Sequence, residues 1–587
     1  MKYTALLYLT ISIFLFACSD DSHNESIDFK SEYPDADAVY IKLVKEYTLN
    51  KDGSVNMHYY HKLKYLTYYS IHRLFGETFI AYNPEYQKLK INKCVTFMND
   101  GKEIAAPENA FNEMLPYFAK HAPSYNHLKE MVITHTGLEP GAIVELDYNI
   151  ESNKDFFPYL LINETAEKNC PVRNLEYIIR IPKEIAANYS FPEDFKIEKD
   201  ENDNFIIYKL NYTNLSAVNH EKYMDYSNLH NVLFSTGSLN QQIKSLVNNP
   251  EFNSDMFPQA EEYLNSLNQD DNKERVKSIA NYVANSLNTY DIPLYYTAYR
   301  YRGPEQVWKS NGGTEFEKTL LLHTLLKNTG IENNIVFTIS NVYDTANVNL
   351  NNIKNFYIEI NDNNKPEYLS AVQSGAINVN EINVCVYQLN DNSKIKSFAA
   401  EKKSTDIEGV LNIDKTNFNG IISLTISDNL RSDNDDFMSF ISCKVNNTSN
   451  ENNKIKFNIS NEIKEKAGYL FIELPYFKEN IEKWNIKWLN TEKKSNMILP
   501  WTATENYQYK IPLNNEIKYV GQNTDTIVDF NTGKAHIKIN ELNDTLNIIR
   551  RFELNNKNVS VKDYSEFKKA LDLWNNKTFR QLVFKKI

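Results

Sequence analysis

The 587-residue sequence has few cysteines, few glycines and no excess of positive charge. Its five cysteines include no C-x-x-C pair, which excludes the usual structural zinc sites, and their wide spacing is not that of a disulfide framework. We therefore expect the internal cysteines, Cys94, Cys170, Cys385 and Cys443, to be mostly buried thiols, and we expect no metal or other cofactor. The formal net charge of −12 leaves no basic surface for nucleic acid, so no nucleic-acid partner is expected.

A second long hydrophobic run is also missing, so the N-terminus is the one candidate for membrane targeting. Residues 1–17, MKYTALLYLTISIFLFA, have one lysine and then an apolar run that is short for a transmembrane helix, which predicts a signal peptide. This run leads into Leu15-Phe16-Ala17-Cys18, which resembles the bacterial lipobox, where the cysteine becomes an acylated N-terminus. The alternative is an uncleaved anchor helix that ends in an incidental cysteine.

Acylation of Cys18 would tie a water-soluble body to a membrane, because buried acyl chains supply the affinity. The next residues, Ser19-Asp20-Asp21, resemble the acidic export tag of surface lipoproteins in Bacteroides-type bacteria. Residues 18–34 are polar and lack a hydrophobic period, so they are predicted to form a flexible tether. We therefore expect an outer-membrane lipoprotein, in the periplasm or exposed at the surface, with the membrane as its first partner.

The length of the chain requires several domains, and three regions follow the tether. Residues 35–237 contain strand-like runs such as 38–49 between turn clusters, which predict an N-terminal antiparallel β-sandwich. Residues 238–378 begin with helical spacing and continue with short strands, which predicts an α+β domain. Residues 379–587 return to strand-like runs between Asn-rich turns, so a β-rich C-terminal region is expected, with one late helix near 564–574.

The stretch NGGTEFEKTLLLHTLLKNTGI, residues 311–331, carries a complete set of helix signals. Thr314 and Glu317 have the spacing of a capping box, and acidic residues in the first turn suit the helix dipole. The leucines supply a buried face, and Gly330 stands where a C-terminal glycine belongs. A helix start of this kind can hold a cysteine nucleophile as its thiolate, but Glu315 occupies that position here. The simpler interpretation of Glu315 is an acid that stabilises the helix.

The run Val276–Ile331 resembles the core of bacterial transglutaminase-like domains, which have a papain-like fold and place Gly-Asp-Cys-Lys-Asp-Lys-Ala before a leucine-rich helix. Here that block is GTEFEKT, residues 313–319, so the cysteine position falls on Glu315. The histidine and aspartate positions of the family fall on Phe356 and Ser370, in the two strands predicted to follow.

The resemblance therefore implies a pseudoenzyme in which no catalytic residue is retained at Glu315, Phe356 or Ser370, because the members of such a triad act as one unit. His323, within the leucine helix, is interpreted as a structural residue. The rival hypothesis is a cysteine-independent hydrolase or acyl transferase of the same superfamily. Glu315 and Glu317 are the acidic pair for such chemistry, but they are two residues apart and point to different sides of the helix.

The flanking regions resemble two companion domains of transglutaminase-like cores in Bacteroidetes proteins. One group of segments resembles the domain of unknown function DUF3857: Asp35–Val39, Tyr82–Leu89, Leu138–Leu146 and Pro171–Glu176. A second group, Glu473-Leu-Pro and Tyr564-Ser-Glu-Phe, resembles DUF3858.

The segment before the leucine helix is dense in tyrosine and carries two arginines. Aromatic faces stack on sugars or peptide planes, and arginine pairs with carboxylates. These residues predict a surface for a glycan or a peptide or protein ligand: Tyr295, Tyr296, Tyr299, Arg300, Arg302 and Trp308. The alternative is that the same side chains pack in the core and at a domain interface. The expected function is thus binding or scaffolding, with a purely structural envelope component as a third possibility.

Overall fold

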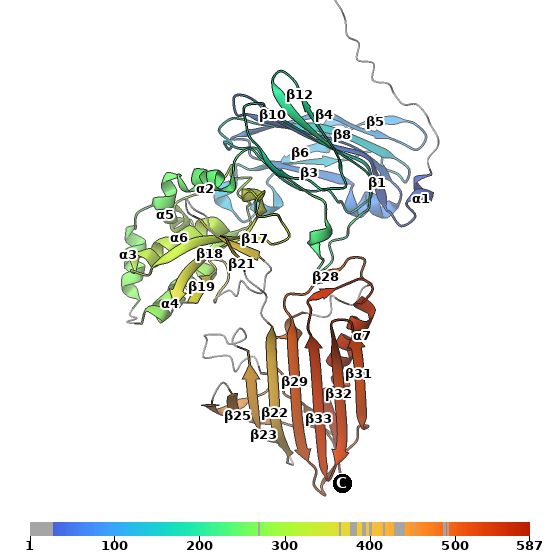
Figure 1. Ribbon diagram of the computed structural model, residues 1–587, viewed down its shortest axis with the longest axis vertical. Helices are drawn as coiled ribbons and strands as arrows, with labels where there is room; N and C mark the ends of the chain where they lie inside the picture. The colour runs from blue at the N-terminus through green and yellow to red at the C-terminus, as the bar shows by residue number, and fades with distance from the viewer. Residues whose placement is uncertain are drawn as a thin grey trace, which may run out of the picture.

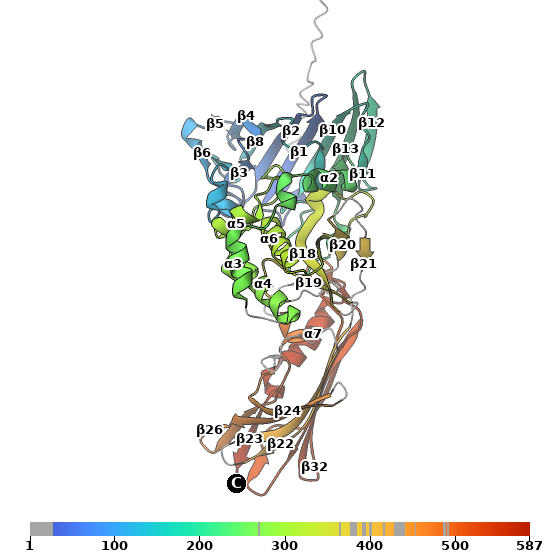
Figure 2. The same ribbon diagram turned by 90° about the vertical axis from the view of Figure 1, so that its left-hand side faces the viewer.

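The computed structural model of the chain is mostly β, with several sheets in distinct units (Figure 1). The N-terminal and C-terminal units lie at opposite ends of the long axis, and the helical central unit lies between them (Figures 1 and 2). The structure describes residues 28–267, 271–362, 365–375, 384–389, 395–397, 402–414, 417–427, 441–451, 454–484, 489 and 492–587. The predicted signal peptide, Cys18 and most of the predicted tether therefore lie outside the described residues.

The N-terminal unit consists of a large sheet covered by two small ones. The large sheet has eight strands, in the order β12 (Lys196–Glu201), β13 (Phe205–Leu215), β10 (Val172–Pro182), β1 (Ala38–Leu49), β2 (Val55–Tyr65), β8 (Ile143–Ser152), β4 (Gln87–Phe97) and β5 (Glu103–Ala105). The small sheets are β11 (Asn188–Ser190), β14 (Asn231–Ser235) and β9 (Leu161–Thr165), and β3 (Glu77–Tyr82), β7 (Lys129–Thr134) and β6 (Phe111–Met114). A short helix, α1 (Phe29–Glu32), precedes β1.

Apolar side chains fill the space between these layers. Tyr177 and Ile179 of β10 are buried together with Phe234 of β14. Leu146 of β8 is buried with Ile133 of β7 in a second cluster. The layers therefore form a sandwich-like unit, but one neighbouring pair, β1 with β10, is parallel where an antiparallel sheet was predicted. The many strands between β1 and β10 in the sequence provide the long connection that a parallel pair requires.

The central unit packs helices on a five-stranded sheet. Its helices are α2 (Leu239–Val247), α3 (Pro258–Ser266), α4 (Asn272–Ser286), α5 (Pro304–Lys309) and α6 (Glu315–Asn328). The sheet runs β19 (Lys365–Leu369), β18 (Ile353–Asp362), β17 (Asn333–Ser340), β20 (Val384–Gln388) and β21 (Ile395–Ser397), and a short parallel pair joins β15 (Asn288–Tyr290) to β16 (Gly312–Thr314). Because β20 and β21 pair into this sheet, it extends beyond residue 378, the predicted end of the domain.

Helix α6 is the centre of this unit and is buried on almost every side. Its leucines at 320, 321, 322, 325 and 326 have no exposed surface. Helices α4 and α5 contact one side of α6, and strands β17 and β18 contact the other. A helix between two layers needs apolar residues all round, which is why its leucines are consecutive instead of following one stripe.

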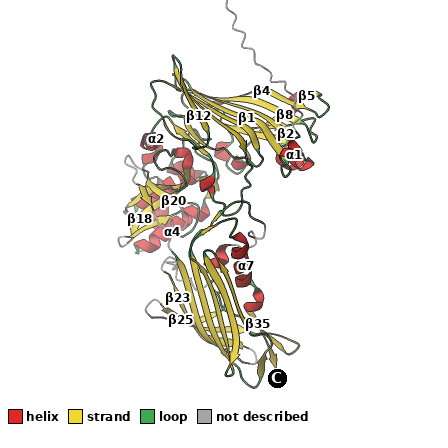
Figure 3. Cartoon of the chain, turned by 45° about the vertical axis from the view of Figure 1, so that its right-hand side comes forward, coloured by secondary structure: helices red, strands yellow, loops and turns green. Residues whose placement is uncertain are grey.

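The C-terminal unit is a second two-layered β structure (Figure 3). Its large sheet runs β24 (Val445–Glu451), β25 (Lys454–Glu462), β23 (Asn417–Ile426), β22 (Lys403–Ile413), β29 (Ala503–Pro512), β33 (Thr545–Leu554), β32 (Gly533–Leu542) and β31 (Thr524–Phe530). A four-stranded sheet runs β26 (Lys464–Lys466), β27 (Tyr469–Glu473), β35 (Gln581–Lys586) and β30 (Ile517–Tyr519), and β28 (Met497–Ile498) pairs with β34 (Asn558–Val559).

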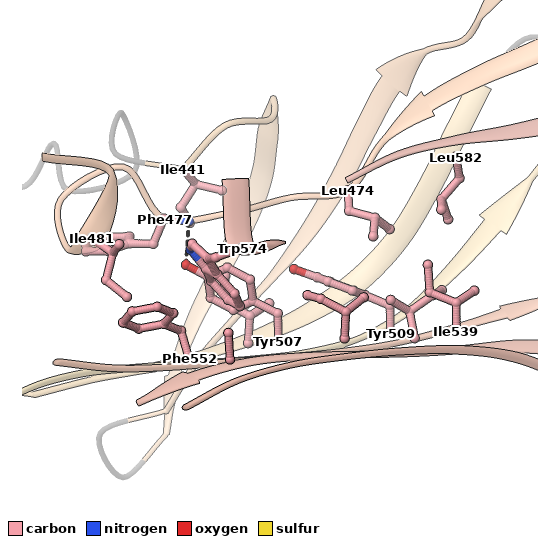
Figure 4. Close-up of a cluster of buried hydrophobic side chains, with 14 of the residues drawn as sticks. Ile441, Leu474, Phe477, Ile481, Tyr507, Tyr509, Ile539, Phe552, Trp574 and Leu582 are labelled. Carbon is pink, nitrogen blue, oxygen red and sulfur yellow. Dashed lines mark hydrogen bonds between the residues drawn. The ribbon is translucent and has the colours of Figure 1, made fainter. Parts of the chain in front are cut away.

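Helix α7 (Tyr564–Asn575) completes this unit, where its Trp574 packs beside Tyr507 of β29 and Phe552 of β33 (Figure 4). The backbone N–H of Phe477 donates to the Tyr507 hydroxyl at 3.3 Å, the dashed contact in Figure 4. A polar group on a buried ring thus meets a backbone partner, as burial of a tyrosine requires.

Candidate functional site

The start of α6 is built as the sequence predicts. Strand β16 leads directly into the helix, with Thr314 as the N-cap residue. The Glu317 N–H donates to Thr314 Oγ1 at 3.3 Å, and the Thr314 N–H donates to Glu317 Oε2 at 2.9 Å, which completes the capping box. This geometry fixes the direction of Glu315, the first residue of the helix, toward strand β18.

Glu315 contacts β18 at Phe356, where the resemblance places a histidine, and at the preceding Asn355. Asn355 Nδ2 donates to Glu315 Oε1 at 3.1 Å, and the Phe356 N–H donates to the same oxygen at 3.3 Å. Burial raises the pKa of Glu315 to about 7, although both hydrogen bonds act in the opposite direction, and the nearby Asp291 raises it further. The carboxyl group can therefore exchange a proton near neutral pH.

The other two triad positions hold groups with structural contacts. The Phe356 ring lies against the Phe316 ring, with centroids 4.7 Å apart, and belongs to the core of the unit. Ser370 follows β19 directly, is 3% exposed, and its Oγ accepts hydrogen bonds from the N–H groups of Val372 and Gln373 at 3.1 and 3.2 Å. A phenyl ring cannot take a proton, and this hydroxyl closes a turn.

Glu317 points to the opposite side of α6, as its spacing from Glu315 predicts, and is completely buried. Its carboxylate accepts hydrogen bonds from the Arg302 backbone N–H at 2.8 Å and from the Arg302 guanidinium at 2.8 and 3.1 Å. Tyr125, in the N-terminal unit, donates its hydroxyl proton to Glu317 Oε1 at 2.5 Å. Glu317 thus holds the domain interface together, and each of these hydrogen bonds has a structural role.

Lys318, the next residue of α6, also has a structural role. Its side chain is fully buried, and its Nζ donates to the carbonyl oxygens of Leu287 and Ala284 at 2.9 and 3.3 Å and to Thr289 Oγ1 at 2.9 Å. These carbonyls lie at the C-terminal end of α4, where backbone acceptors lack helical partners. Burial lowers the pKa of Lys318 to about 8, but its three acceptors define a helix cap.

The six residues of the predicted ligand surface are engaged inside the chain. Gln87 Nε2 donates to the Tyr295 hydroxyl at 3.2 Å, and the Tyr296 ring stacks on Phe118 at a centroid distance of 4.8 Å. The Tyr299 ring lies 4.1 Å from that of Phe157.

The arginines and the tryptophan have partners as well. Arg300 donates to the Asp155 carbonyl at 2.8 Å, and Arg302 donates to Ser124 Oγ at 2.8 Å. Trp308 packs against Phe257 within the central unit, with ring centroids 5.7 Å apart. Five of the six residues therefore face the N-terminal unit, which is the alternative interpretation of this segment. A ligand surface on them stays a prediction, and it would require the two units to separate.

One thiol lies against an imidazole, but in the N-terminal unit and not beside Glu315. Cys94 Sγ is 3.7 Å from His135 Nδ1, and His135 Nε2 is 2.8 Å from Thr78 Oγ1. Burial raises the pKa of Cys94 to about 11 and lowers the pKa of His135 to about 4. Both groups are held neutral, whereas a catalytic pair needs a lowered thiol pKa and a charged imidazole.

The remaining histidine and cysteine predictions concern structural roles. His323 Nδ1 lies 2.7 Å from Asn333 Oδ1, so the ring has a partner within its own unit. All four internal cysteines are free, and Cys94, Cys170 and Cys385 are buried, as predicted. Over the described ranges, no helix combines the length and the apolar character that a bilayer span requires.

Asn355 and Tyr125 are the site residues that sequence reasoning missed. Asn355 lies 40 residues beyond Glu315, and Tyr125 lies 192 residues before Glu317. Neither stands in a spacing that marks a partner, so the sequence alone carried no signal for these contacts.

Known families match both ends of this architecture. Residues 51–219, within the N-terminal unit, match DUF3857, and residues 469–584, within the C-terminal unit, match DUF3858. Each family is described as a domain of unknown function with a solved structure. No curated protein matches the chain.

A solved structure matches the whole architecture. It is a crystal structure of a protein from Parabacteroides distasonis ATCC 8503, described provisionally as a protease, with 24% sequence identity and a TM-score of 0.73. The match covers 94% of this chain and 99% of that chain, and at this identity it establishes the fold alone. A CBM3a-L domain of a Clostridium thermocellum cellulosome scaffoldin matches over 20% of this chain and 69% of its own, at 16% identity, but its TM-score of 0.12 carries no structural weight. The chain therefore combines a region that matches DUF3857 with a region that matches DUF3858.

Proposed function

We propose that the central unit is a transglutaminase-like domain without its nucleophilic device, and that the chain is a binding or scaffold protein of the cell envelope. The observation that carries this proposal is the 3.3 Å hydrogen bond from the Phe356 N–H to Glu315 Oε1. It brings together the positions at which the resemblance expects a cysteine and a histidine. A carboxylate and a phenyl ring stand there, and neither can form or activate a thiolate.

The surrounding charged groups support the same conclusion. Glu317 and Arg302 neutralise each other at the domain interface, and Lys318 caps a helix. Each of these groups is committed to holding the fold, so the start of α6 offers Glu315 no basic partner among them. The ligand class of the proposal is a glycan or a peptide or protein.

The proposal includes a lipid anchor on Cys18, which would place the body at the outer membrane. It rests on the lipobox-like sequence Leu15-Phe16-Ala17-Cys18 and on the polar segment that follows.

A second candidate is a hydrolase or acyl transferase that works without cysteine. It is favoured by one observation, the pKa of about 7 that burial gives to Glu315, because an acid–base catalyst works best near the ambient pH. The provisional description of the Parabacteroides protein as a protease also favours this second candidate. Asp291, which raises the pKa of Glu315, would be the second carboxyl group of such a site.

The two candidate functions predict different results in one assay. The chain from residue 18 with Cys18→Ser is incubated with a mixed peptide substrate and, separately, with the same peptides and a fluorescent primary amine. The proposed function predicts no hydrolysis and no amine incorporation, in this chain or in its Glu315→Gln variant. Turnover that Glu315→Gln abolishes would establish the second candidate, and turnover that a thiol reagent blocks would contradict both.

A further inference from the structure

The N-terminal unit carries a polar groove that lies apart from Glu315. Its volume is about 610 Å³, which is within the range of small-molecule sites. The turn between β1 and β2, the segment leading into β4 and the end of β8 enclose it. Val55, Pro84 and the ring of Tyr86 are its apolar lining, and its other lining residues are polar or charged.

Four adjacent strands form the floor of this groove. Thr48 of β1 lies opposite Asn56 of β2, Asn56 lies opposite Glu151 of β8, and Glu151 lies opposite Lys88 of β4. Directly opposed residues point to the same face of a sheet, with Cβ atoms about 4.5–5.5 Å apart. The four side chains therefore form one row across the sheet, with a hydroxyl, an amide, a carboxylate and an ammonium group in that order.

The wall of the groove is built by the segment before β4. Glu85 is exposed there, and the ring of Tyr86 is held by the Arg300 guanidinium, whose Cζ lies 4.5 Å from the ring centroid. Beneath the row, Gln87 Nε2 donates to Ser152 Oγ at 3.1 Å. The Arg300 contact and the Gln87–Ser152 hydrogen bond thus hold Tyr86 and strands β4 and β8 in place, which reduces the cost of ordering them around a ligand.

We propose that this groove binds a neutral oligosaccharide, an assignment that rests on the proposed binding function and names its ligand class and site. When a saccharide binds, its hydroxyl groups give up hydrogen bonds to water and form hydrogen bonds to carboxylate and amide groups of the protein. In this row, Glu151 supplies the carboxylate and Asn56 supplies the amide. A peptide would need apolar pockets for its side chains, and the lining offers almost none. The charged lining residues are Glu85, Glu151 and Lys88, so a polyanionic glycan would meet a net negative charge.

Calorimetric titration with defined oligosaccharides tests this site. The chain from residue 18 with Cys18→Ser is titrated with cellohexaose, maltohexaose, xylohexaose and chitohexaose as neutral probes and with hexagalacturonate as the anionic probe. We expect saturable binding of at least one neutral probe and a weaker response to hexagalacturonate. Glu151→Ala should lower the affinity for the probe that binds at least about tenfold, because hydrogen bonds to charged groups are stronger than those to neutral groups.

Two further variants make the result specific. Thr48→Val keeps the shape of the floor and removes one hydroxyl, so it should weaken binding without affecting folding. Glu108→Gln, at an exposed position of a short 3-10 helix (Glu108–Ala110), is the matched control and should bind as the unchanged chain does.

Three outcomes would overturn the groove assignment: no neutral probe binds at millimolar concentration, hexagalacturonate or a peptide binds in preference, or a neutral probe binds equally well to Glu151→Ala and Thr48→Val. The last outcome leaves a binding role in place and moves it elsewhere on the chain. Conversely, turnover that depends on Glu315 would overturn the proposed function and leave the groove result unchanged.

Discussion

At the scale of single residues, Glu315 combines two opposing influences. Its place in the first turn of α6 favours the charged carboxylate through the helix dipole. Its burial favours the protonated form and outweighs the hydrogen bonds from Asn355 and Phe356, so the pKa is raised to about 7. The same side chain is therefore a weaker helix-stabilising acid than its position in the sequence indicates.

Glu315→Gln should flatten the pH dependence of stability between about pH 4.5 and 7. In this window the folded chain keeps a proton that the unfolded chain has released, so the unchanged chain loses stability as the pH rises, by at most about 3 kcal/mol. Melting temperature measured against pH for both proteins checks this. Glu262→Gln, at an exposed position of α3, is the control and should keep the original slope. An unchanged slope in Glu315→Gln would contradict the assignment.

Lys318→Met should destabilise the chain by about 1–3 kcal/mol, because the carbonyls of Ala284 and Leu287 would lose a buried donor. The urea midpoint of the transition that includes the central unit measures the loss. Lys309→Met, at an exposed position of α5, should change stability by less than about 0.5 kcal/mol. Equal midpoints for the two variants would show that Lys318 does not cap α4.

At the scale of elements, local signals were sufficient wherever partners are close in sequence. The capping box at Thr314 and the glycine at 330, with its φ of +79°, define the start of α6 and the chain reversal after it, and both were predicted. The strand predicted over 38–49 is β1, and the late helix predicted near 564–574 is α7. Periodicity and turn residues are properties of a short window, so a single sequence carries them.

The same reasoning was incomplete where pairing is long-range. Nothing in the sequence indicates that β1 pairs in parallel with β10, or that Asn355 reaches Glu315. The Tyr- and Arg-rich segment before α6 was ambiguous for a physical reason, since aromatic residues and arginine are enriched at ligand surfaces and domain interfaces alike. Its partners, such as Phe118 and Phe157, lie in another unit, so the sequence around the segment does not indicate this packing.

The contact between the segment containing Tyr125 and helix α6 yields a prediction at this scale. Tyr125→Phe removes the hydroxyl that donates to buried Glu317, so the urea midpoint should fall, by about 1–3 kcal/mol in free energy of unfolding. Combining it with Glu317→Gln should cost less than the sum of the two single changes, because both remove the same bond. Tyr117→Phe, at a position 76% exposed, is the control. Additive losses would indicate that the two side chains are not coupled.

At the scale of the whole molecule, the helical unit lies between two β units in the sequence, and the β units also contact each other directly through the Met224–Met497 bridge. The N-terminal and central units share a polar and aromatic interface. Tyr125, Arg302 and Glu317 form one polar cluster in that interface. A chain held in this way presents a fixed arrangement of surfaces, which suits a binding or scaffold role.

The proposed anchor gives a prediction at the same scale. Cells that express the full chain and are fed an alkyne-labelled fatty acid should incorporate label into this protein, and the protein should sediment with membranes. Cys18→Ser should abolish the label and release the protein, because the acyl chains supply the membrane affinity. Label that persists in Cys18→Ser would place the anchor elsewhere, and membrane retention without label would favour an uncleaved N-terminal helix.

The proposal that the chain has no working nucleophile is tested most directly by the alkylation rates of the internal thiols in the folded chain with Cys18→Ser at pH 7, followed by mass spectrometry. Burial raises the pKa of Cys94 to about 11, so its thiolate is roughly a hundredfold or more scarcer than that of a free cysteine. We predict that Cys94, Cys170, Cys385 and Cys443 react only after unfolding in urea. A folded-state thiol that reacts faster than free cysteine, with Cys94 beside His135 as the first to inspect, would contradict this conclusion.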